Sequence, residues 1–114
     1  MKKSNPTDCT SAILPVRDAL DVISGKWKLL ILISISSGNE RFTEIQKSIP
    51  KITAKVLSKE LKDLEEHQLI ERKIIDDYPV KIEYSVTPYS QTLGRVIKEL
   101  RDWGKNHRKK IIGK

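Results

Sequence analysis

The chain has 114 residues and a formal net charge of +7, with an isoelectric point near 9.6. That length fits one domain, and the excess of lysine and arginine favours a polyanionic partner, nucleic acid before an anionic membrane. The single cysteine, Cys9, excludes an internal disulfide, and the longest apolar run, Leu29–Ile35, is too short to span a membrane. The N-terminus lacks the apolar segment of a secretory signal, so we expect a cytoplasmic protein.

The first third of the chain predicts an arm and two helices. Residues 1–12 are polar, and we expect them to form a flexible N-terminal arm before a single domain over residues 13–112. A helix is predicted over residues 13–23, with Pro15 near its first turn, because apolar residues recur there at helical spacing: Ile13, Val16, Ala19, Leu20 and Ile23. The segment Lys26–Ser37 is apolar on almost every side, which predicts a helix buried against several neighbours; its β-branched residues leave a buried strand as the alternative.

Two further helices follow in close succession. Arg41–Ile49 is predicted to be a short helix that Pro50 ends, and Thr53 is a favourable N-cap for a helix over residues 52–68. In that fourth helix the apolar positions share one side: Ala54, Val56, Leu57, Leu61 and Leu64. Two helices with a tight connection, the second with a basic outer face, are typical of a helix-turn-helix.

The order of charges along the fourth helix is unusual. Lysines occupy its N-terminal half and acidic residues its C-terminal end, although the helix dipole favours the opposite order. Such a departure without an evident structural gain suggests a functional surface. We therefore expect four side chains to contact the DNA major groove and its phosphates: Lys55, Ser58, Lys59 and Lys62. Thr53 could touch a phosphate as well as cap the helix. The alternative for the four side chains of the helix is that they form a solvated face without a binding role.

The next segment predicts a β-hairpin. Residues 69–75 and 81–87 alternate in the manner of strands, and Asp76–Pro79 lies between them as a turn. Arg72, Lys73 and Lys81 on the shoulders of the hairpin are candidates for phosphate or minor-groove contacts, whereas the acidic tip would be repelled. Arg41 is a candidate phosphate clamp, with a surface ion pair as the alternative.

The last segment predicts one long helix, with Thr87 as its N-cap and Pro88 in its first turn. Its apolar stripe runs through Tyr89, Leu93, Val96, Ile97, Leu100, Trp103, His107 and Ile111. This stripe is longer than a hairpin and three short helices can cover, so we expect a two-fold dimer. The predicted interface comprises Ile13, Val16, Leu20, Leu93, Ile97, Leu100 and Trp103. The alternative is that both terminal helices fold over their own core, as part of each must do.

These elements predict a mainly α fold with a small β-hairpin, that is, a winged helix-turn-helix with an additional long C-terminal dimerisation helix. The stretches ALDVISGKWKLLIL, RFTEIQ, LSKELKDLEEHQLIER, YPVKIEYSVT and DWG closely resemble the HxlR-type bacterial transcriptional regulators, which are MarR-like winged-helix proteins. The likeness covers residues 13 to 107. It implies a winged-helix homodimer that binds operator DNA through its helix-turn-helix and pairs through its terminal helices.

Cys9 is a possible redox sensor, because several members of the family sense electrophiles or oxidants through an N-terminal cysteine. The family's cysteine directly precedes a proline, and the matching position here is Leu14, before Pro15. Cys9 lies five residues earlier, so this role is not carried over directly. Ser90 also stands where the family has a glycine.

We find no arrangement of residues typical of catalysis, and His67 and His107 have no neighbours at metal-ligand spacing. We therefore expect no enzyme activity, no cofactor and no metal. The predicted function is a sequence-specific transcriptional regulator that binds double-stranded DNA as a homodimer on a pseudo-palindromic operator, without a membrane partner. Electrophiles, the redox state or an unidentified small molecule are the candidate signals for its regulation. The alternative is a winged-helix protein-interaction module that does not bind specific DNA.

Overall fold

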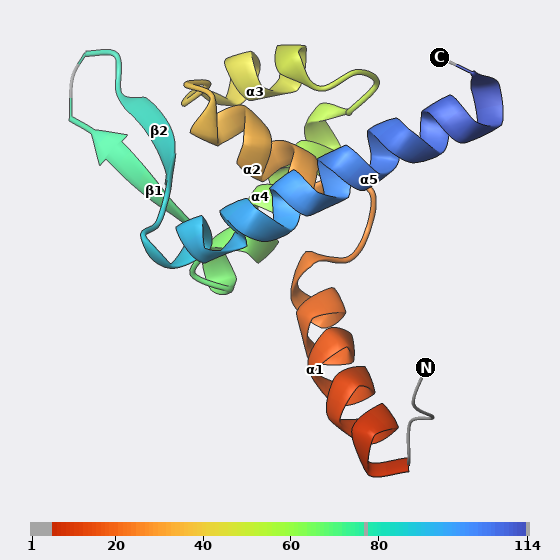
Figure 1. The fold of residues 1–114 in the computed structure, drawn as a ribbon. Helices are drawn as coiled ribbons and strands as arrows, with labels where there is room; N and C mark the ends of the chain where they lie inside the picture. Colours follow the sequence, from red (N-terminus) through yellow and green to blue (C-terminus); the bar gives the residue numbers. More distant parts are fainter. Residues whose placement is uncertain (1–5, 77, 114) are drawn as a thin grey trace.

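A computed structural model describes residues 6–76 and 78–113, and their side chains from Ser11 onward. Figure 1 shows the order of the elements: α1 (Pro6–Ile23), α2 (Lys28–Ser36), α3 (Phe42–Ser48), α4 (Ala54–Glu66), β1 (Ile70–Ile75), β2 (Lys81–Val86), the 3₁₀ helix η1 (Tyr89–Leu93) and α5 (Gly94–Ile112). The extents of 63 × 36 × 23 Å reflect α1, which projects away from the other elements (Figure 1). Among the described helices, none combines the length and the hydropathy that crossing a bilayer requires.

The core lies between α2, α3, α4 and the base of the hairpin. It consists of buried aliphatic side chains: Ile31, Leu32, Ile35, Ile45, Ile49, Ile52, Leu57, Leu61, Leu64, Leu69 and Ile70. The predicted helix over α2 is confirmed and the strand alternative is wrong. Burial on every side of α2 is not found, because Leu30 and Ile33 are 42% and 41% exposed. A helix that is apolar all round needs cover all round, and the other elements of the chain leave Leu30 and Ile33 uncovered.

α3 and α4 form the predicted helix-turn-helix. Ile49 and Ile52 are buried on either side of the connection and anchor it to the core. The Thr53 hydroxyl accepts a hydrogen bond from the Val56 N–H at 3.2 Å, which confirms Thr53 as the N-cap of α4. In the connection between α3 and α4, Lys51 has a φ of +68°, in the left-handed region. This conformation costs a non-glycine residue about 1 kcal/mol, and it turns the chain from α3 into α4.

The two strands form an antiparallel hairpin that rests on the helices. One face carries the pairs Ile70–Val86, Arg72–Tyr84 and Ile74–Ile82, and the other carries Glu71–Ser85, Lys73–Glu83 and Ile75–Lys81. The Tyr84 N–H donates to the Glu40 carbonyl at 2.8 Å, and the Thr87 hydroxyl donates to the Gln68 carbonyl at 2.8 Å. These bonds attach the hairpin to the loop before α3 and to the end of α4, so the wing is held at both sides of its base.

α4 ends in a Schellman motif without a glycine. The Gln68 N–H donates to the Glu65 carbonyl and the Leu69 N–H donates to the Leu64 carbonyl, both at 3.0 Å. Gln68 occupies the left-handed position of this motif with a φ of +62°. Glycine usually stands there, because its missing Cβ removes the steric penalty.

Replacing Gln68 by glycine is therefore expected to raise the free energy of unfolding by about 1 kcal/mol. Gln68 is exposed, so the substitution removes little packing. Urea denaturation at one protein concentration measures the change. Gln68→Ala is the matched control, because alanine keeps the Cβ at positive φ. If the alanine variant were stabilised as much as the glycine variant, backbone strain would not be the cause.

The segment expected to be one helix from Tyr89 has two parts, which corrects the prediction. The Thr87 hydroxyl does accept the Ser90 N–H at 3.1 Å, so Thr87 caps this segment. The buried Ser90 hydroxyl returns a hydrogen bond to the Thr87 carbonyl at 2.9 Å. These short-range bonds within residues 87–90 accompany a 3₁₀ turn, and the regular α-helix begins only at Gly94. Ser90 thus fits this turn in place of the glycine of the family pattern.

Most of each terminal helix lies away from the core of its own chain, although Val22 and Ile23 at the end of α1 pack against that core and Ile97 of α5 is half-buried. α1 begins at Pro6 and not at Ile13, and helical backbone therefore covers part of the stretch expected to be an arm. Pro15 consequently lies inside the helix, where proline costs about 3 kcal/mol. All side chains from 11 to 21 are exposed, and α5 has no buried residue. An isolated helix of this kind is only marginally stable in water.

Candidate nucleic-acid interface

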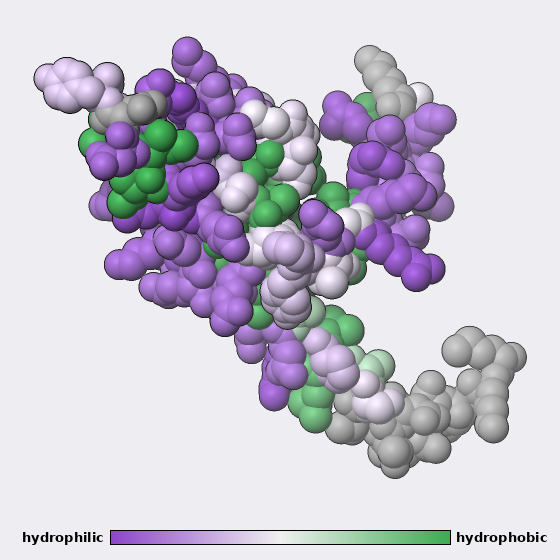
Figure 2. Space-filling model, turned by 90° about the vertical axis from the view of Figure 1, so that its left-hand side faces the viewer, coloured by the Kyte–Doolittle hydropathy of each residue, from purple (hydrophilic) through white to green (hydrophobic). Residues whose placement is uncertain are grey.

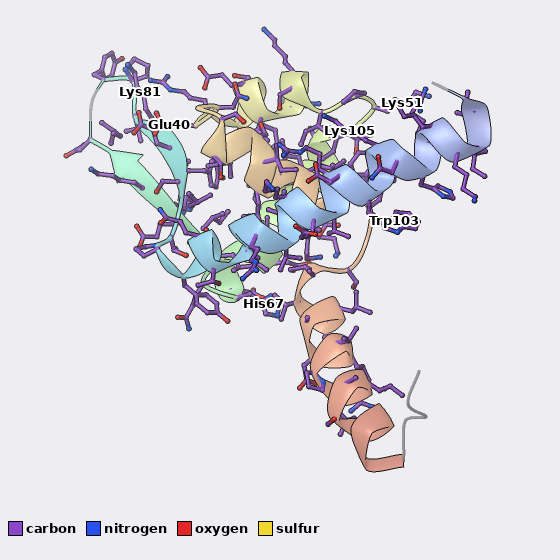
Figure 3. All side chains as sticks on the ribbon, in the orientation of Figure 1. Glu40, Lys51, His67, Lys81, Trp103 and Lys105 are labelled. Atoms are coloured by element: carbon purple, nitrogen blue, oxygen red, sulfur yellow. The ribbon has the colours of Figure 1, made fainter. Side chains whose placement is uncertain are left out.

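The exposed side of α4 carries the predicted lysines. Leu57, Leu61 and Leu64 are buried against the core. Lys55, Ser58, Lys59 and Lys62 are exposed on the same helix. The exposed Thr53 lies at the N-terminus of α4. Lys51, which is labelled in Figure 3, precedes Thr53 in the connection between α3 and α4. The predicted division of α4 into a buried apolar side and an exposed basic side is thus present in the structure.

Arg41 stands at the N-cap of α3 and is half-buried. The Glu44 carboxylate accepts the backbone N–H groups of Glu40 and Arg41 at 3.1 and 3.2 Å. Glu44 therefore satisfies the two backbone donors that immediately precede α3, as in a capping box. The Arg41 guanidinium makes no ion pair among the described residues, so the alternative of a surface ion pair finds no support there.

A groove runs between α4 and the hairpin. Its lining brings together Ser58, Leu61, Lys62, Glu65, Arg72 and Tyr84. Burial raises the pKa of the Tyr84 phenol, against a smaller lowering effect of Arg72. The phenol is therefore neutral at physiological pH and can donate a hydrogen bond to an anion. Arg72 thus belongs with the lysines of α4, an association that depends on how the hairpin docks.

The other two basic residues of the hairpin lie on its opposite face. Lys73 is paired across the strands with Glu83, and Lys81 with Ile75. Lys73 is exposed, whereas Lys81 is half-buried. Lys73 and Lys81 thus point away from the face of Arg72, because alternate residues of a strand point to opposite faces; their contact with phosphates stays a prediction. Arg72 lines the groove that contains Lys62, whereas Lys73 lines a second hollow together with Arg72 and with Glu65 at the end of α4.

The end of the hairpin is apolar to an extent that the sequence did not lead us to expect. The exposed side chains there are Ile74, Tyr78, Val80 and Ile82, with exposures of 57%, 101%, 60% and 38%. Figure 2 shows this hydrophobic patch at the far end of the hairpin, surrounded by hydrophilic surface. Consecutive isoleucines at 74 and 75 were the available signal, since strict alternation would leave one of them exposed.

An ion-pair network joins α2 to α4 beneath the lysine face. Lys28 Nζ lies 2.6 Å from Glu60 Oε1 and 3.6 Å from Asp63 Oδ2. Lys59 Nζ lies 3.2 Å from the same Asp63 oxygen. The hydrogen bond with Asp63 raises the pKa of Lys59, and the hydrogen bond with Lys59 lowers the pKa of Asp63. Both groups are therefore charged at neutral pH. Lys28 was not a predicted site residue, because its hydrogen-bond partner Glu60 lies 32 residues away in α4.

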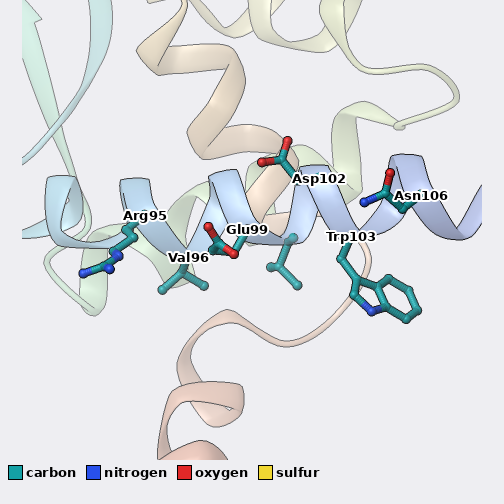
Figure 4. A pocket seen from close by; sticks show the side chains of 7 residues that line it. Arg95, Val96, Glu99, Asp102, Trp103 and Asn106 are labelled. Atoms are coloured by element: carbon teal, nitrogen blue, oxygen red, sulfur yellow. The ribbon is translucent and has the colours of Figure 1, made fainter.

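The predicted dimer residues form apolar surfaces on α1 and α5. Ile13, Val16 and Leu20 on α1 are 55%, 56% and 51% exposed. On α5, Leu100 and Trp103 are 51% and 66% exposed, while Ile97 and the preceding Leu93 are half-buried. Figure 4 shows the shallow hollow along α5 that is lined by Arg95, Val96, Glu99, Leu100, Asp102, Trp103 and Asn106. Large apolar patches on a soluble domain are typical of protein contacts.

The remaining predictions concern the redox role of Cys9 and the absence of a metal site at His67 and His107. The side chain of Cys9 lies outside the described residues, so its predicted redox role stays a prediction. His67 ends α4, where its ring Nδ1 lies 2.9 Å from the Asp63 carbonyl oxygen, and the His107 ring stacks on Trp103 with centroids 4.8 Å apart. Within the described residues, no cluster of three His, Cys, Asp or Glu side chains has the arrangement of a metal site.

Comparison with known proteins agrees with this arrangement. The family model described as HxlR-like helix-turn-helix matches residues 22–111. The uncharacterized HTH-type transcriptional regulator YdeP of Bacillus subtilis (strain 168) is 40% identical over 97 residues, which cover 85% of this chain and 76% of YdeP.

Solved structures agree as well. The redox regulator HypR in its reduced form has a TM-score of 0.80 at 33% identity, covering 88% of this chain and 99% of that chain. Diamide-treated YodB from B. subtilis has a TM-score of 0.69 at 31% identity, covering 82% of this chain and 92% of that chain. With its helix-turn-helix, wing and exposed basic α4, the chain belongs to the HxlR-like helix-turn-helix family of DNA-binding transcriptional regulators.

Proposed function

We propose that the protein is a homodimeric regulator that binds a pseudo-palindromic operator with one α4 helix in each of two major grooves. The observation that carries this proposal is the exposed row of Lys55, Lys59 and Lys62 on α4, whose last member, Lys62, lines a groove with Arg72. Cationic side chains on a helix with a buried opposite side suit insertion into a major groove. Thr53, Ser58 and Arg41 lie at or near helix starts on the same motif and are the proposed additional phosphate contacts.

The dimer is proposed from the uncovered apolar surfaces. α1 has an interior proline and exposed side chains throughout residues 11–21, so its own protomer gives it almost no support. α2 and α5 also expose large apolar side chains, including Leu30, Ile33 and Leu100. A second copy would cover these surfaces symmetrically. Two helix-turn-helix motifs related in this way would read half-sites about 34–36 Å apart.

The basic residues on the outer hairpin face have a secondary place in this proposal. Lys73 stands opposite Glu83, which offsets its charge locally, and Lys81 is half-buried. They remain candidates for phosphates that flank the major-groove contact. The apolar end of the hairpin would contribute no phosphate contact of its own.

Salt dependence tests the proposal against the alternative of a protein-interaction module. If the cations Lys55, Lys59, Lys62 and Arg72 of both protomers each neutralise one phosphate, log affinity should fall against log salt with a slope of about −7. Fluorescence anisotropy on a duplex selected from a random pool measures this slope. A protein-interaction module would bind weakly, select no sequence and show almost no salt dependence.

A further inference from the structure

One lysine of the proposed DNA-binding side of α4 already forms an ion pair within the protein. Lys59 Nζ lies 3.2 Å from Asp63 Oδ2, one helical turn further along α4. Among the described residues, neither Lys55 nor Lys62 has an ion pair within 4.0 Å. Lys62 has an acid at the same spacing, Glu66, yet the two side chains do not meet. The pairing of Lys59 is therefore not a general consequence of the charge pattern on α4.

Asp63 is held in place by a second cation from the core side. Lys28 on α2 lies 3.6 Å from the same Asp63 oxygen, and its own side chain is only 13% exposed. The Asp63 side chain is 30% exposed, whereas that of Lys59 is 72% exposed. Lys59 can therefore swing into solvent, while Asp63 stays near the surface of the core with Lys28 beside it. The lowered pKa of Asp63 keeps this carboxylate charged at physiological pH.

We propose that Asp63 competes with DNA for Lys59 and so limits the affinity of α4 for any duplex. This inference rests on the proposed DNA-binding function and adds a regulating residue to it. In the free protein Asp63 holds Lys59 along the helix. On DNA, Lys59 exchanges Asp63 for a phosphate or base acceptor, and Asp63 stays paired with Lys28. The exchange lowers the gain from the Lys59 contact on every duplex, because the pair with Asp63 must be broken before Lys59 can bind DNA.

The test compares two neutralising substitutions on the same helix. Asp63→Asn removes the competitor and keeps the Lys28–Glu60 pair at 2.6 Å, so the fold should persist. Glu66→Gln removes the same unit of charge from an exposed acid at the same spacing from a lysine. On a mixed-sequence duplex of about 30 base pairs, Asp63→Asn is expected to bind about two- to fivefold more tightly than Glu66→Gln, the range of an exposed ion pair. Asp63→Ala gives a second measure if the asparagine variant folds poorly.

The decisive comparison repeats both substitutions in a variant that already carries Lys59→Gln. Without Lys59 there is nothing for Asp63 to hold, so adding Asp63→Asn to Lys59→Gln should give no gain beyond that of adding Glu66→Gln. The inference is overturned if Asp63→Asn and Glu66→Gln tighten binding equally, or if the gain persists without Lys59. Those outcomes leave the DNA-binding proposal intact. If the folded wild-type protein binds no duplex at low salt, the proposed function fails and this inference fails with it.

Discussion

A variant in which Lys55 and Lys59 are both replaced by glutamate is expected to bind its selected duplex about 100-fold more weakly than wild type. Both side chains are exposed in the N-terminal half of α4. Each substitution removes one cation from the DNA face and adds a charge that DNA phosphates repel. Because a dimer would then neutralise about four fewer phosphates, the slope of log affinity against log salt should become shallower by about 4. Anisotropy titrations at several salt concentrations measure both quantities.

The matched control carries the same change of charge on another surface. Lys105 and Lys109 are exposed on α5, outside the helix-turn-helix. Their double replacement by glutamate alters only the long-range field, which salt screens, and should weaken binding less than about threefold at physiological salt. Equal losses in the two double variants would show that net charge, and not the surface of α4, determines the affinity. Circular dichroism checks that both variants are folded.

Introducing aspartate at Leu20 and Leu100 together is expected to convert the protein from a dimer to a monomer at micromolar concentration. Both side chains are large, apolar and about half exposed, one on α1 and one on α5. If they lie in a dimer interface, each aspartate would be buried without a partner, at a cost of several kcal/mol per dimer. Light scattering coupled to size-exclusion chromatography measures the mass.

Operator affinity should fall with the dimer, by about 100-fold or more, because the two half-sites would then be bound independently. Val80→Asp is the control: Val80 is 60% exposed on the hairpin and lies outside the predicted interface. Its substitution should leave the mass that of a dimer. A wild-type protein that is monomeric at micromolar concentration, or a double variant that remains dimeric, would contradict the proposed interface.

Hydrophobic periodicity alone was sufficient to predict the helices and strands that bury one face against the core. The spacing of Leu57, Leu61 and Leu64 predicted the buried side of α4, and the alternation of residues 81–87 predicted β2. These patterns depend only on residues close in the chain. The starts of α1 and α5 were predicted less well, because polar stretches and 3₁₀ turns lack a clear hydrophobic period.

The associations between distant segments could not be read from the sequence. Lys28 meets Glu60 and Asp63 only because α2 packs across α4, and Arg72 joins Lys62 only because the hairpin docks beside α4. The placement of Lys73 and Arg72 on opposite faces of the hairpin follows from strand pleating once the hairpin is folded. Local rules can locate candidate cations, whereas tertiary packing decides which of them act together.

The unusual charge order of α4 now has a partial physical account. Asp63 stands near the C-terminal end of the helix, where an anion is disfavoured by the dipole, yet its two lysine partners offset that cost. Glu65 lines the groove beside Arg72. Nothing in the structure explains Glu66, which is exposed and has no ion pair among the described residues.

A chemical footprint on the selected duplex tests the central proposal most directly, namely that a dimer places one α4 helix in each of two major grooves. Methylation protection of guanine N7 reports on the major groove alone. Two protected segments are expected, related by a pseudo-two-fold axis and centred about 10 base pairs apart. Loss of both segments in the Lys55→Glu, Lys59→Glu variant would assign them to α4. A single protected segment, or binding without any major-groove protection, would contradict the proposal.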